Sequence, residues 1–415
     1  MKRRDFLKLG AAAALAGCAS AERRAKARVM VIGAGFGGAT AAKYVAMWDP
    51  GIEVVLLERG TQFISCPISN LVLGGNRTMQ DITRGYEGLR KHGVQIINAE
   101  AVAVDGAKRS VTLGDGRTLA YDRLVLSPGV DFLFNEVQGY QGAEPRVLHA
   151  WKAGPQTVEL RRQLEAMPDG GVYLLSVPTA PYRCPPGPYE RACQVAHYFK
   201  RAKPRSKVLV LDANPDVTSK GPLFKRAWED LYKEIIEYRA NSKVVAVDAS
   251  GMSVRTDFDT VKADVLNVVP PQRAADIALR AGVITTNNRW CDVDWRTMES
   301  KAVKGIHVLG DATLSASGMP KSGHMANAHA KLCAAALVEL LNGREPDATP
   351  LINNTCYSFV SDKEAMHVAS VHQYDPAQHT LLPVKGAGGV SAARSELEGG
   401  YAWSWARNIW ADMLA

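Results

Sequence analysis

The sequence predicts an α/β fold with two βαβ units and a smaller region at the C-terminus. Three patterns lead to this prediction. An apolar run from residue 28 ends in the glycine turn Gly33-x-Gly35-x-x-Gly38. A second succession of strand, loop and helix spans 171–212, and a short apolar strand capped by Gly310-Asp311 follows. Strands that alternate with helices are typical of parallel sheets covered by helices.

Length and composition are those of a globular protein with more than one domain. The chain has 415 residues, of which 47% are hydrophobic and 22% are charged, enough for two or three sizeable cores. No apolar run reaches the roughly 20 residues that a membrane-spanning helix needs. The net charge of +8 permits an acidic protein partner, but without basic-aromatic interleaving it does not favour nucleic acid.

Residues 1–26 are predicted to be an export signal. Arg3-Arg4, inside Lys2–Lys8, matches the twin-arginine signal, and an apolar run over 9–16 follows. Leu15-Ala-Gly-Cys18 also resembles a bacterial lipobox, which would place a lipid on Cys18, whereas cleavage near 19–21 is the alternative. We therefore expect a periplasmic protein, either free or lipid-anchored.

The first glycine turn predicts a dinucleotide site. Its glycines allow a tight turn, close approach of the backbone to a pyrophosphate, and close packing of helix on strand. The predicted helix at 39–48 would face the phosphates with its free N–H groups. The second strand, 52–57, ends in Glu58, where an acid is expected to meet a ribose hydroxyl.

Strands are also expected at 94–104, 109–113 and 121–127, with a hairpin turn at 114–117. A loop after the second strand carries Cys66, at the end of the sheet where a cofactor should sit. A single cysteine is by itself more often a small buried hydrophobic residue than a reactive group.

The second βαβ unit has no glycine fingerprint. Its strands are expected at 171–177 and 207–211, and its helix at 189–201. The connecting loop, 178–188, is rich in proline, which has no N–H to offer a phosphate. We infer a duplicated nucleotide-binding unit that has lost its nicotinamide site and carries Cys184 in that loop.

A third pattern lies near Gly310-Asp311. In FAD proteins such a strand-ending Gly-Asp places an aspartate on the ribityl chain. Pro320, Lys321 and Ser322 then precede a predicted helix at 325–341. A helix N-terminus aimed at the flavin would stabilise negative charge on its reduced ring.

The tail, 346–415, contains Cys356 and ends in a segment with Trp403, Trp405 and Trp410. Tryptophans at such short spacing are more often core or dimer contacts than part of a cofactor site.

Together these motifs resemble the flavoprotein subunit of flavocytochrome c sulfide dehydrogenase. The resemblance implies two dinucleotide-binding (Rossmann-like) domains of the glutathione-reductase type and a small C-terminal domain. The implied divisions are 1–26 (signal), 27–150 (FAD-binding, first part), 151–274 (degenerate NAD-like domain), 275–345 (FAD-binding, second part) and 346–415 (C-terminal domain). The motifs that carry the resemblance are GAGFGGATAAKY at 33–44, Cys66 with SN at 69–70, HAWKAG at 149–154, RCPPGPYE at 183–190, PPQR at 270–273, GIHVLGDA at 305–312, MPKSG at 319–323 and NTCYS at 354–358.

The resemblance also implies the site. FAD would be bound covalently through Cys66, and Cys184 and Cys356 would form a redox-active disulfide with Glu190 beside it. No metal site is expected, and Cys193, Cys291 and Cys333 are interpreted as buried thiols. The implied FAD contacts are Gly33, Ala34, Gly35, Phe36, Gly37, Gly38, Glu58, Arg59, Gly310, Asp311, Pro320, Lys321 and Ser322.

The implied activity is oxidation of sulfide to sulfane sulfur. A disulfide is a suitable electrophile for hydrosulfide, because thiol–disulfide exchange passes through such an attack. The chain contains no C-x-x-C-H, so a separate cytochrome c subunit with one or two haems is the expected acceptor. The alternatives are a sulfide:quinone oxidoreductase and a flavoprotein that reactivates a sulfur-carrier protein.

Overall fold

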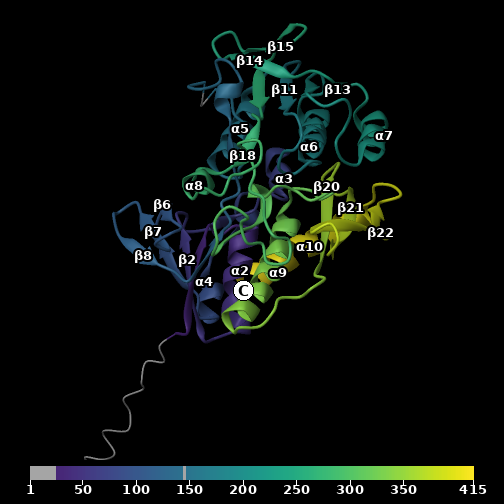
Figure 1. Ribbon diagram of the computed structural model, residues 1–415. Coiled ribbons are helices and arrows are strands. Elements are labelled where there is room, and N and C mark those ends of the chain that lie inside the picture. The colour runs from purple at the N-terminus through teal and green to yellow at the C-terminus, as the bar shows by residue number, and fades with distance from the viewer. Residues whose placement is uncertain (1–24, 144–145) are drawn as a thin grey trace, which may run out of the picture.

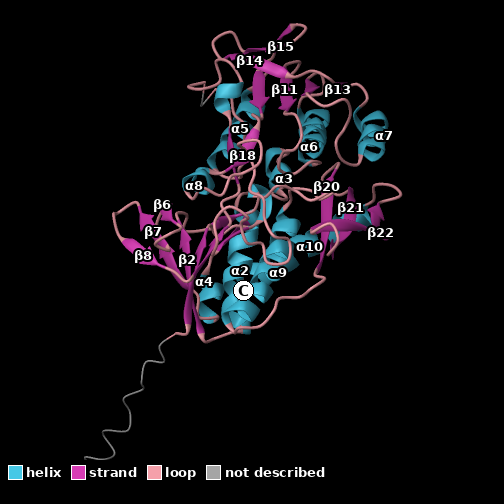
Figure 2. Ribbon diagram, viewed as in Figure 1, coloured by secondary structure: helices cyan, strands magenta, loops and turns pink. Residues whose placement is uncertain are grey.

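The computed structural model describes residues 25–143 and 146–415 (Figure 1). The predicted twin-arginine signal and the lipobox at Cys18 lie outside the described residues. Figure 1 shows three groups of elements: the sheet with α2 and α9 below, a second sheet with α5–α7 above, and β20–β22 to the right. Figure 2 shows helices flanking both of the larger sheets, which confirms the predicted α/β class.

The first sheet is built around β1 (Ala27–Ile32). Its strands pair in parallel, in the order β19-β9-β1-β2-β5. Five of the six residues of β1 are buried, as expected for a strand covered on both faces. The helices α2 (Phe36–Trp48) and α9 (Gly323–Leu341) pack side by side against this sheet. The other strands are β2 (Ile52–Glu58), β5 (Gln95–Asn98), β9 (Arg123–Leu126) and β19 (Ile306–Val308).

The second sheet repeats the parallel arrangement in the order β13-β12-β11-β17. Its helix α6 (Gly187–Ala202) begins directly after the proline-rich loop, so the predicted βαβ unit is present. The remaining members are β11 (Val172–Val177), β12 (Lys207–Asp212), β13 (Ile236–Arg239), β17 (Val265–Val268), α5 (Pro155–Ala166) and α7 (Gly221–Tyr232).

The C-terminal segment forms an antiparallel sheet of β20 (Leu351–Phe359), β21 (Ala365–Asp375) and β22 (Thr380–Val390), followed by α10 (Glu396–Leu414). This segment does not stand apart from the rest. The Tyr44 hydroxyl of α2 donates to Asp412 Oδ1 of α10 at 2.5 Å, and β20 contacts α6 and α9. The tail therefore joins the two larger sheets.

The run at 94–104, predicted as one strand, is divided into two. β5 ends at Asn98 and belongs to the first sheet, whereas β6 begins at Ala101 and pairs with β7 in a separate small sheet. The break follows from hydrogen bonding at the end of the first sheet, where the Ala99 N–H donates to the carbonyl of Glu58 at 3.1 Å.

Short elements complete the fold and connect the two larger sheets. The pair β10–β18 bridges the segments that lead into and out of the second sheet. These elements are β3 (Phe63–Ile64), β4 (Thr83–Arg84), β6 (Ala101–Asp105), β7 (Ser110–Leu113), β8 (Thr118–Ala120), β10 (Val130–Phe132), β14 (Val244–Asp248), β15 (Ser253–Thr256), β16 (Thr260–Lys262), β18 (Gln272–Ala274), α3 (Ser69–Leu73), α4 (Glu87–Lys91), α8 (Asp276–Arg280) and three 3₁₀ turns, Gln80–Ile82, Phe134–Glu136 and Gly310–Ala312.

Candidate active site

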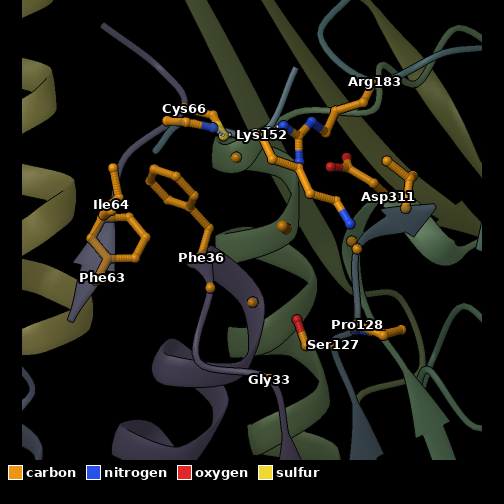
Figure 3. Close-up of a pocket in the computed structure, with 18 of the residues that line it drawn as sticks. Gly33, Phe36, Phe63, Ile64, Cys66, Ser127, Pro128, Lys152, Arg183 and Asp311 are labelled. Atoms are coloured by element: carbon orange, nitrogen blue, oxygen red, sulfur yellow. Dashed lines mark hydrogen bonds between the residues drawn. The ribbon is translucent and has the colours of Figure 1, made fainter. Parts of the chain in front are cut away.

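A cavity of about 590 Å³ lies at the carboxyl ends of the first sheet's strands and reaches the loop before α6. Figure 3 shows one part of it, with Gly33 and Ser127 at one end and Cys66, Arg183 and Asp311 at the other. Of the predicted site residues, Gly38, Pro320 and Lys321 do not line the cavity. Those that do are Gly33, Ala34, Gly35, Phe36, Gly37, Glu58, Arg59, Cys66, Cys184, Glu190, Gly310, Asp311, Ser322 and Cys356.

The three glycines of the first turn have three different environments. Gly33 has φ +92°, and a Cβ there would lie 2.5 Å from the carbonyl oxygen of Ser127. A Cβ on Gly38 would lie 1.8 Å from the carbonyl oxygen of Gly33, so this glycine lets α2 pack against the turn. A Cβ on Gly35 would meet nothing within 4 Å and would project into open space beside the cavity. That space is where a pyrophosphate would approach the backbone.

Glu58 fixes the turn from the end of β2. Its carboxylate accepts hydrogen bonds from the backbone N–H of Ala34 at 2.7 Å and of Gly60 at 2.8 Å. A carboxylate has about four acceptor positions, so capacity remains for a ribose hydroxyl on the cavity side.

Asp311 also lines the cavity. It is buried, and its Oδ1 has no hydrogen-bond partner among the residues that the structure describes. Burial raises the pKa of this carboxyl. Since buried polar atoms are almost always hydrogen-bonded, an unpartnered oxygen that faces a cavity fits a ligand hydroxyl such as one of a ribityl chain.

The segment after Asp311 supports the wall rather than lining it. The Lys321 ammonium donates to the Asp311 carbonyl at 3.0 Å and lies 3.7 Å from the centre of the Trp290 ring, so its side chain points away from the cavity. Ser322 caps α9, because its Oγ accepts from the Met325 N–H at 3.0 Å. The first turn of α9 therefore faces the cavity, as predicted from the sequence.

Cys66 is held beside a buried guanidinium. Its Sγ accepts from Arg183 Nη2 at 3.1 Å and from the Ala153 N–H at 3.3 Å. Figure 3 shows Cys66 and Arg183 on the same side of the cavity, above Phe36. Sequence reasoning did not assign a role to Arg183, although it directly precedes Cys184 in the most specific motif.

Cys184 and Cys356 come from distant segments and line the same cavity. Cys184 has φ +59°, and its N–H donates to the Lys321 carbonyl at 2.8 Å. Cys356 lies on β20. Burial raises the pKa of the Cys184 thiol, and the nearby Glu190 and Cys356 raise it further. Both thiols are free in this structure, and the disulfide between them stays a prediction.

Glu190 connects the elements around the two cysteines. It lies in the first turn of α6, is buried, and accepts from Asn70 Nδ2 and from the Phe359 N–H, both at 2.8 Å. Burial raises its pKa, so the carboxyl can hold a proton closer to neutral pH than an exposed glutamate.

Two polar residues near Cys356 were not predicted. Asn354 Nδ2 donates to Cys356 Sγ at 3.3 Å, while its Oδ1 accepts from the Ser322 hydroxyl at 2.6 Å. Lys220 Nζ donates to the Cys356 carbonyl at 2.9 Å. Asn354 lies inside the motif at 354–358, whereas no sequence pattern marks Lys220.

The C-terminal tryptophans divide between the core and the site. Trp410 is buried in the core, as the sequence favoured. Trp405 instead lines the cavity with Tyr357 and His324, and its Nε1 donates to His324 Nδ1 at 3.4 Å. The spacing of tryptophans in the sequence does not reveal this difference, because it depends on how α10 packs.

The acid at the end of β12 is occupied by protein groups. Asp212 is fully buried and accepts from the Tyr189 hydroxyl at 2.7 Å and the Tyr238 hydroxyl at 3.0 Å. Tyr182, from the proline-rich loop, is also buried and bonds to Thr218 at 2.7 Å. Side chains thus fill the crevice where a second dinucleotide would bind.

The other cysteines are not part of the site. Cys193, Cys291 and Cys333 are free and buried, as predicted. Within residues 25–143 and 146–415 no group of three metal-ligating side chains occurs, and no helix there combines the length and apolarity needed to cross a bilayer.

The segments that match known protein families cover most of the chain. Residues 157–270 match the family described as the sulfide dehydrogenase [flavocytochrome c] flavoprotein chain, central, and residues 348–414 match flavocytochrome c sulphide dehydrogenase, flavin-binding. Residues 27–166 match pyridine nucleotide-disulphide oxidoreductase. The sulfide dehydrogenase [flavocytochrome c] flavoprotein chain of Chlorobaculum thiosulfatiphilum is 56% identical over 45 residues, which are 94% of that sequence and 11% of this chain. The chain belongs to the flavocytochrome c sulfide dehydrogenase flavoprotein family.

Longer but weaker similarities extend to another class of sulfide enzyme. The mitochondrial sulfide:quinone oxidoreductase of Mus musculus is 23% identical over 301 residues, which cover 69% of this chain and 65% of the mouse protein. The crystal structure of the sulfide:quinone oxidoreductase from Aquifex aeolicus has a TM-score of 0.75 at 20% identity and covers 93% of this chain and 91% of its own. At this identity the structural likeness establishes the common fold.

The flavin-binding assignment of the family agrees with the cavity. The open space at Gly35, the unpartnered oxygen of Asp311 and the capped N-terminus of α9 are suited to a pyrophosphate, a ribityl chain and an electron-rich ring respectively. The cavity therefore fits FAD.

Because the environments of Gly35 and Gly38 differ, substitutions at the two positions are expected to have different effects. We expect Gly35→Val to keep the fold, since φ there is −74°, and to lower flavin content about tenfold or more by filling the cradle. Gly38→Ala should instead destabilise the protein by about 1–3 kcal/mol through its clash with Gly33. Flavin-to-protein ratio and urea unfolding of the two variants measure this; normal flavin content in Gly35→Val would argue against the cradle.

The filled crevice at Asp212 predicts that NADH does not reduce the flavin. Stoichiometric NADH under argon should leave the flavin absorbance unchanged, while dithionite, as the control, should bleach it. Rapid bleaching by NADH would show that the second unit still binds the nucleotide.

Proposed function

We propose that the protein is a sulfide:cytochrome c oxidoreductase that oxidises sulfide to sulfane sulfur through Cys184 and Cys356. The observation that carries the proposal is that both cysteines line the same cavity as Glu190. Cys184 comes from the loop before α6 and Cys356 from β20, whose Phe359 N–H donates to Glu190. Membership of the family supports it. Both thiols are half-buried, which leaves them accessible to a small nucleophile in the cavity.

The chain's own groups would divide the work as follows. The two sulfurs, joined as a disulfide, offer hydrosulfide an electrophile, and attack on one sulfur breaks the bond and leaves an electron pair on the other. Glu190, with its pKa raised by burial, can hold the proton that H₂S releases. Asn354 Nδ2 orients Cys356 Sγ at 3.3 Å. When bound in the cavity, FAD would supply the acceptor for this electron pair.

A cytochrome c subunit is the proposed acceptor, because the chain has no haem-attachment motif of its own and its family is a flavocytochrome. The similarity to sulfide:quinone oxidoreductases over 69% of the chain favours quinone as the second candidate. Haem that co-purifies with the flavoprotein from its native host would distinguish the two acceptors.

We also propose that the enzyme works in the periplasm, either free or anchored by a lipid on Cys18. The twin arginines at 3–4 and the lipobox support this location. Export of a folded protein suits one that binds its cofactor before transport.

Covalent attachment of FAD to Cys66 completes the proposal. Arg183 Nη2 at 3.1 Å and the Ala153 N–H at 3.3 Å both donate to the Cys66 sulfur, so two donors fix the position of this sulfur at the cavity wall.

The cysteine pair is tested by substitution. Cys184→Ser and Cys356→Ser should each reduce sulfide-driven cytochrome reduction to the uncatalysed background and still bind flavin, because the Gly33–Gly38 turn is unchanged. Cys193→Ala, on the same helix as Glu190 but outside the cavity, is the matched control and should remain active. Normal turnover by either serine variant would refute the mechanism.

Covalent attachment predicts that flavin stays with the denatured protein. Acid precipitation should leave the yellow colour in the pellet of the wild type and in the supernatant of Cys66→Ala. Cys291→Ala, a buried thiol outside the cavity, should behave like the wild type. Flavin in the wild-type supernatant would exclude the covalent bond.

A further inference from the structure

Lys220 is a buried cation in a position that local rules disfavour. It is the N-cap residue of α7, its φ is +57°, and only 7% of it is exposed. The N-terminus of a helix is the positive end of its dipole and repels a cation, a left-handed backbone is uncommon outside glycine, and burial of a charge is costly. Sequences break several local rules together mainly at functional sites.

The Lys220 ammonium points to the strand that carries Cys356. Its Nζ donates to the Cys356 carbonyl at 2.9 Å and to the Ser358 hydroxyl at 2.8 Å. Within the described part of the chain, no carboxylate lies within 4.0 Å of Nζ, so the cation has no ion-pair partner there. The ring of Phe224 lies 6.0 Å from Nζ.

The titratable groups that face Lys220 come from four parts of the fold. They are Cys356 on β20, Glu190 on α6, Cys184 in the loop before α6 and Glu398 on α10, and Cys356 has the largest electrostatic influence of the four. Of these four groups, only the thiols of Cys184 and Cys356 could receive the negative charge that the proposed exchange produces.

The two thiols differ in their surroundings. Burial and the carboxylate of Glu190 raise the pKa of Cys184, whereas Cys356 has the Lys220 ammonium beside its backbone and the Asn354 amide on its sulfur. In thiol–disulfide exchange the sulfur that better bears negative charge leaves faster.

We infer that Lys220 is a positioning residue that stabilises negative charge on Cys356, so that sulfide attacks Cys184 and Cys356 leaves. The inference rests on the proposed function and assigns a role to each cysteine. Hydrosulfide sulfur forms a bond to Cys184 Sγ, the Cys184–Cys356 bond breaks, and its electron pair goes to Cys356 Sγ. The proton stays on the new persulfide, and the single negative charge of hydrosulfide moves to Cys356, so the step needs no other reactant.

The protonation of Lys220 limits the pH range of this effect. Burial lowers its pKa to about 8, while Cys356, Glu190, Cys184 and Glu398 oppose the shift. The ammonium is therefore mostly charged at pH 7 and loses its proton as the pH rises through 8. Its assistance to Cys356 should fade over that interval.

Alkylation of the reduced holoprotein tests the charge on Cys356 without any turnover. Iodoacetamide is applied in short pulses across a pH series, and the Cys356 peptide is quantified by mass spectrometry. Lys220→Gln should shift the midpoint of the Cys356 profile upward by about 1–3 pH units, the effect of losing one nearby opposite charge, whereas Lys220→Arg should keep it close to the wild type. An unchanged profile in Lys220→Gln would overturn the inference.

Lys203→Gln is the matched control. Lys203 is also a buried lysine whose Nζ donates to backbone carbonyls, those of Glu165 and Met167, but it lies outside the cavity. Its variant should show the wild-type profile. A shift equal to that of Lys220→Gln would mean that the effect is a general result of altered folding, and would count against the inference.

A second measurement uses the wild type alone and stands if Lys220→Gln does not fold. Oxidised holoprotein is mixed with one equivalent of sulfide, quenched within milliseconds by iodoacetamide, and mapped. The additional sulfur is expected on the Cys184 peptide, and its presence on Cys356 instead would overturn the assignment. Sulfide that fails to bleach wild-type flavin would refute the proposed function itself, while the alkylation profile would still decide the role of Lys220.

Discussion

One buried carboxylate, Glu190, holds together the parts of the chain that form the site. It projects from α6 and accepts hydrogen bonds from Asn70 of α3 and from the backbone of Phe359 in β20. Asn70 follows the Cys66 loop, Glu190 follows Cys184, and Phe359 follows Cys356 by three residues. The three cysteines of the proposed mechanism are thus positioned through a single side chain. Removal of a buried partner in such a network leaves the others unsatisfied, so the geometry of the site depends on it.

The same burial determines the electrostatics. Glu190, Asp311 and Cys184 are all ionisable groups whose pKa values are raised by burial, while burial lowers those of Lys220 and Lys321. Desolvation therefore moves every one of these groups toward its neutral form. The thiol exchange that we propose would therefore take place among groups whose neutral forms are favoured by burial.

Much of the fold could be predicted because its determinants are local. The turn at Gly33–Gly38 depends on contacts among neighbours in the sequence, such as the 1.8 Å approach that excludes a Cβ on Gly38, and the first strands and helix follow from their apolar patterns. The prediction of a single strand at 94–104 was wrong, because each half of this segment joins a different sheet. Of the 17 site residues that the family motifs predict, 14 line the cavity, although Lys321 supports its wall from behind.

Arg183 and Lys220 acquire their importance only through long-range contacts, whereas Asn354 contacts Cys356 two residues away. Arg183 reaches Cys66 across 117 positions, and Lys220 reaches Cys356 across 136. No periodicity or spacing in the sequence encodes such contacts, because they are set by how the proline-rich loop packs against the Cys66 loop and how the start of α7 packs against β20.

The second βαβ unit illustrates how one architecture can exchange a ligand site for a reactive one. The acid that ends β12 is still present as Asp212, but the hydroxyls of Tyr189 and Tyr238 satisfy it. Tyr189 belongs to the same helical turn as Glu190, so its hydrogen bond to Asp212 also fixes the start of α6. The loop that would otherwise bind phosphate is then free to present Cys184, with its left-handed backbone held by the Lys321 carbonyl. Filling the nucleotide crevice and positioning the cysteine are, in this fold, consequences of the same packing.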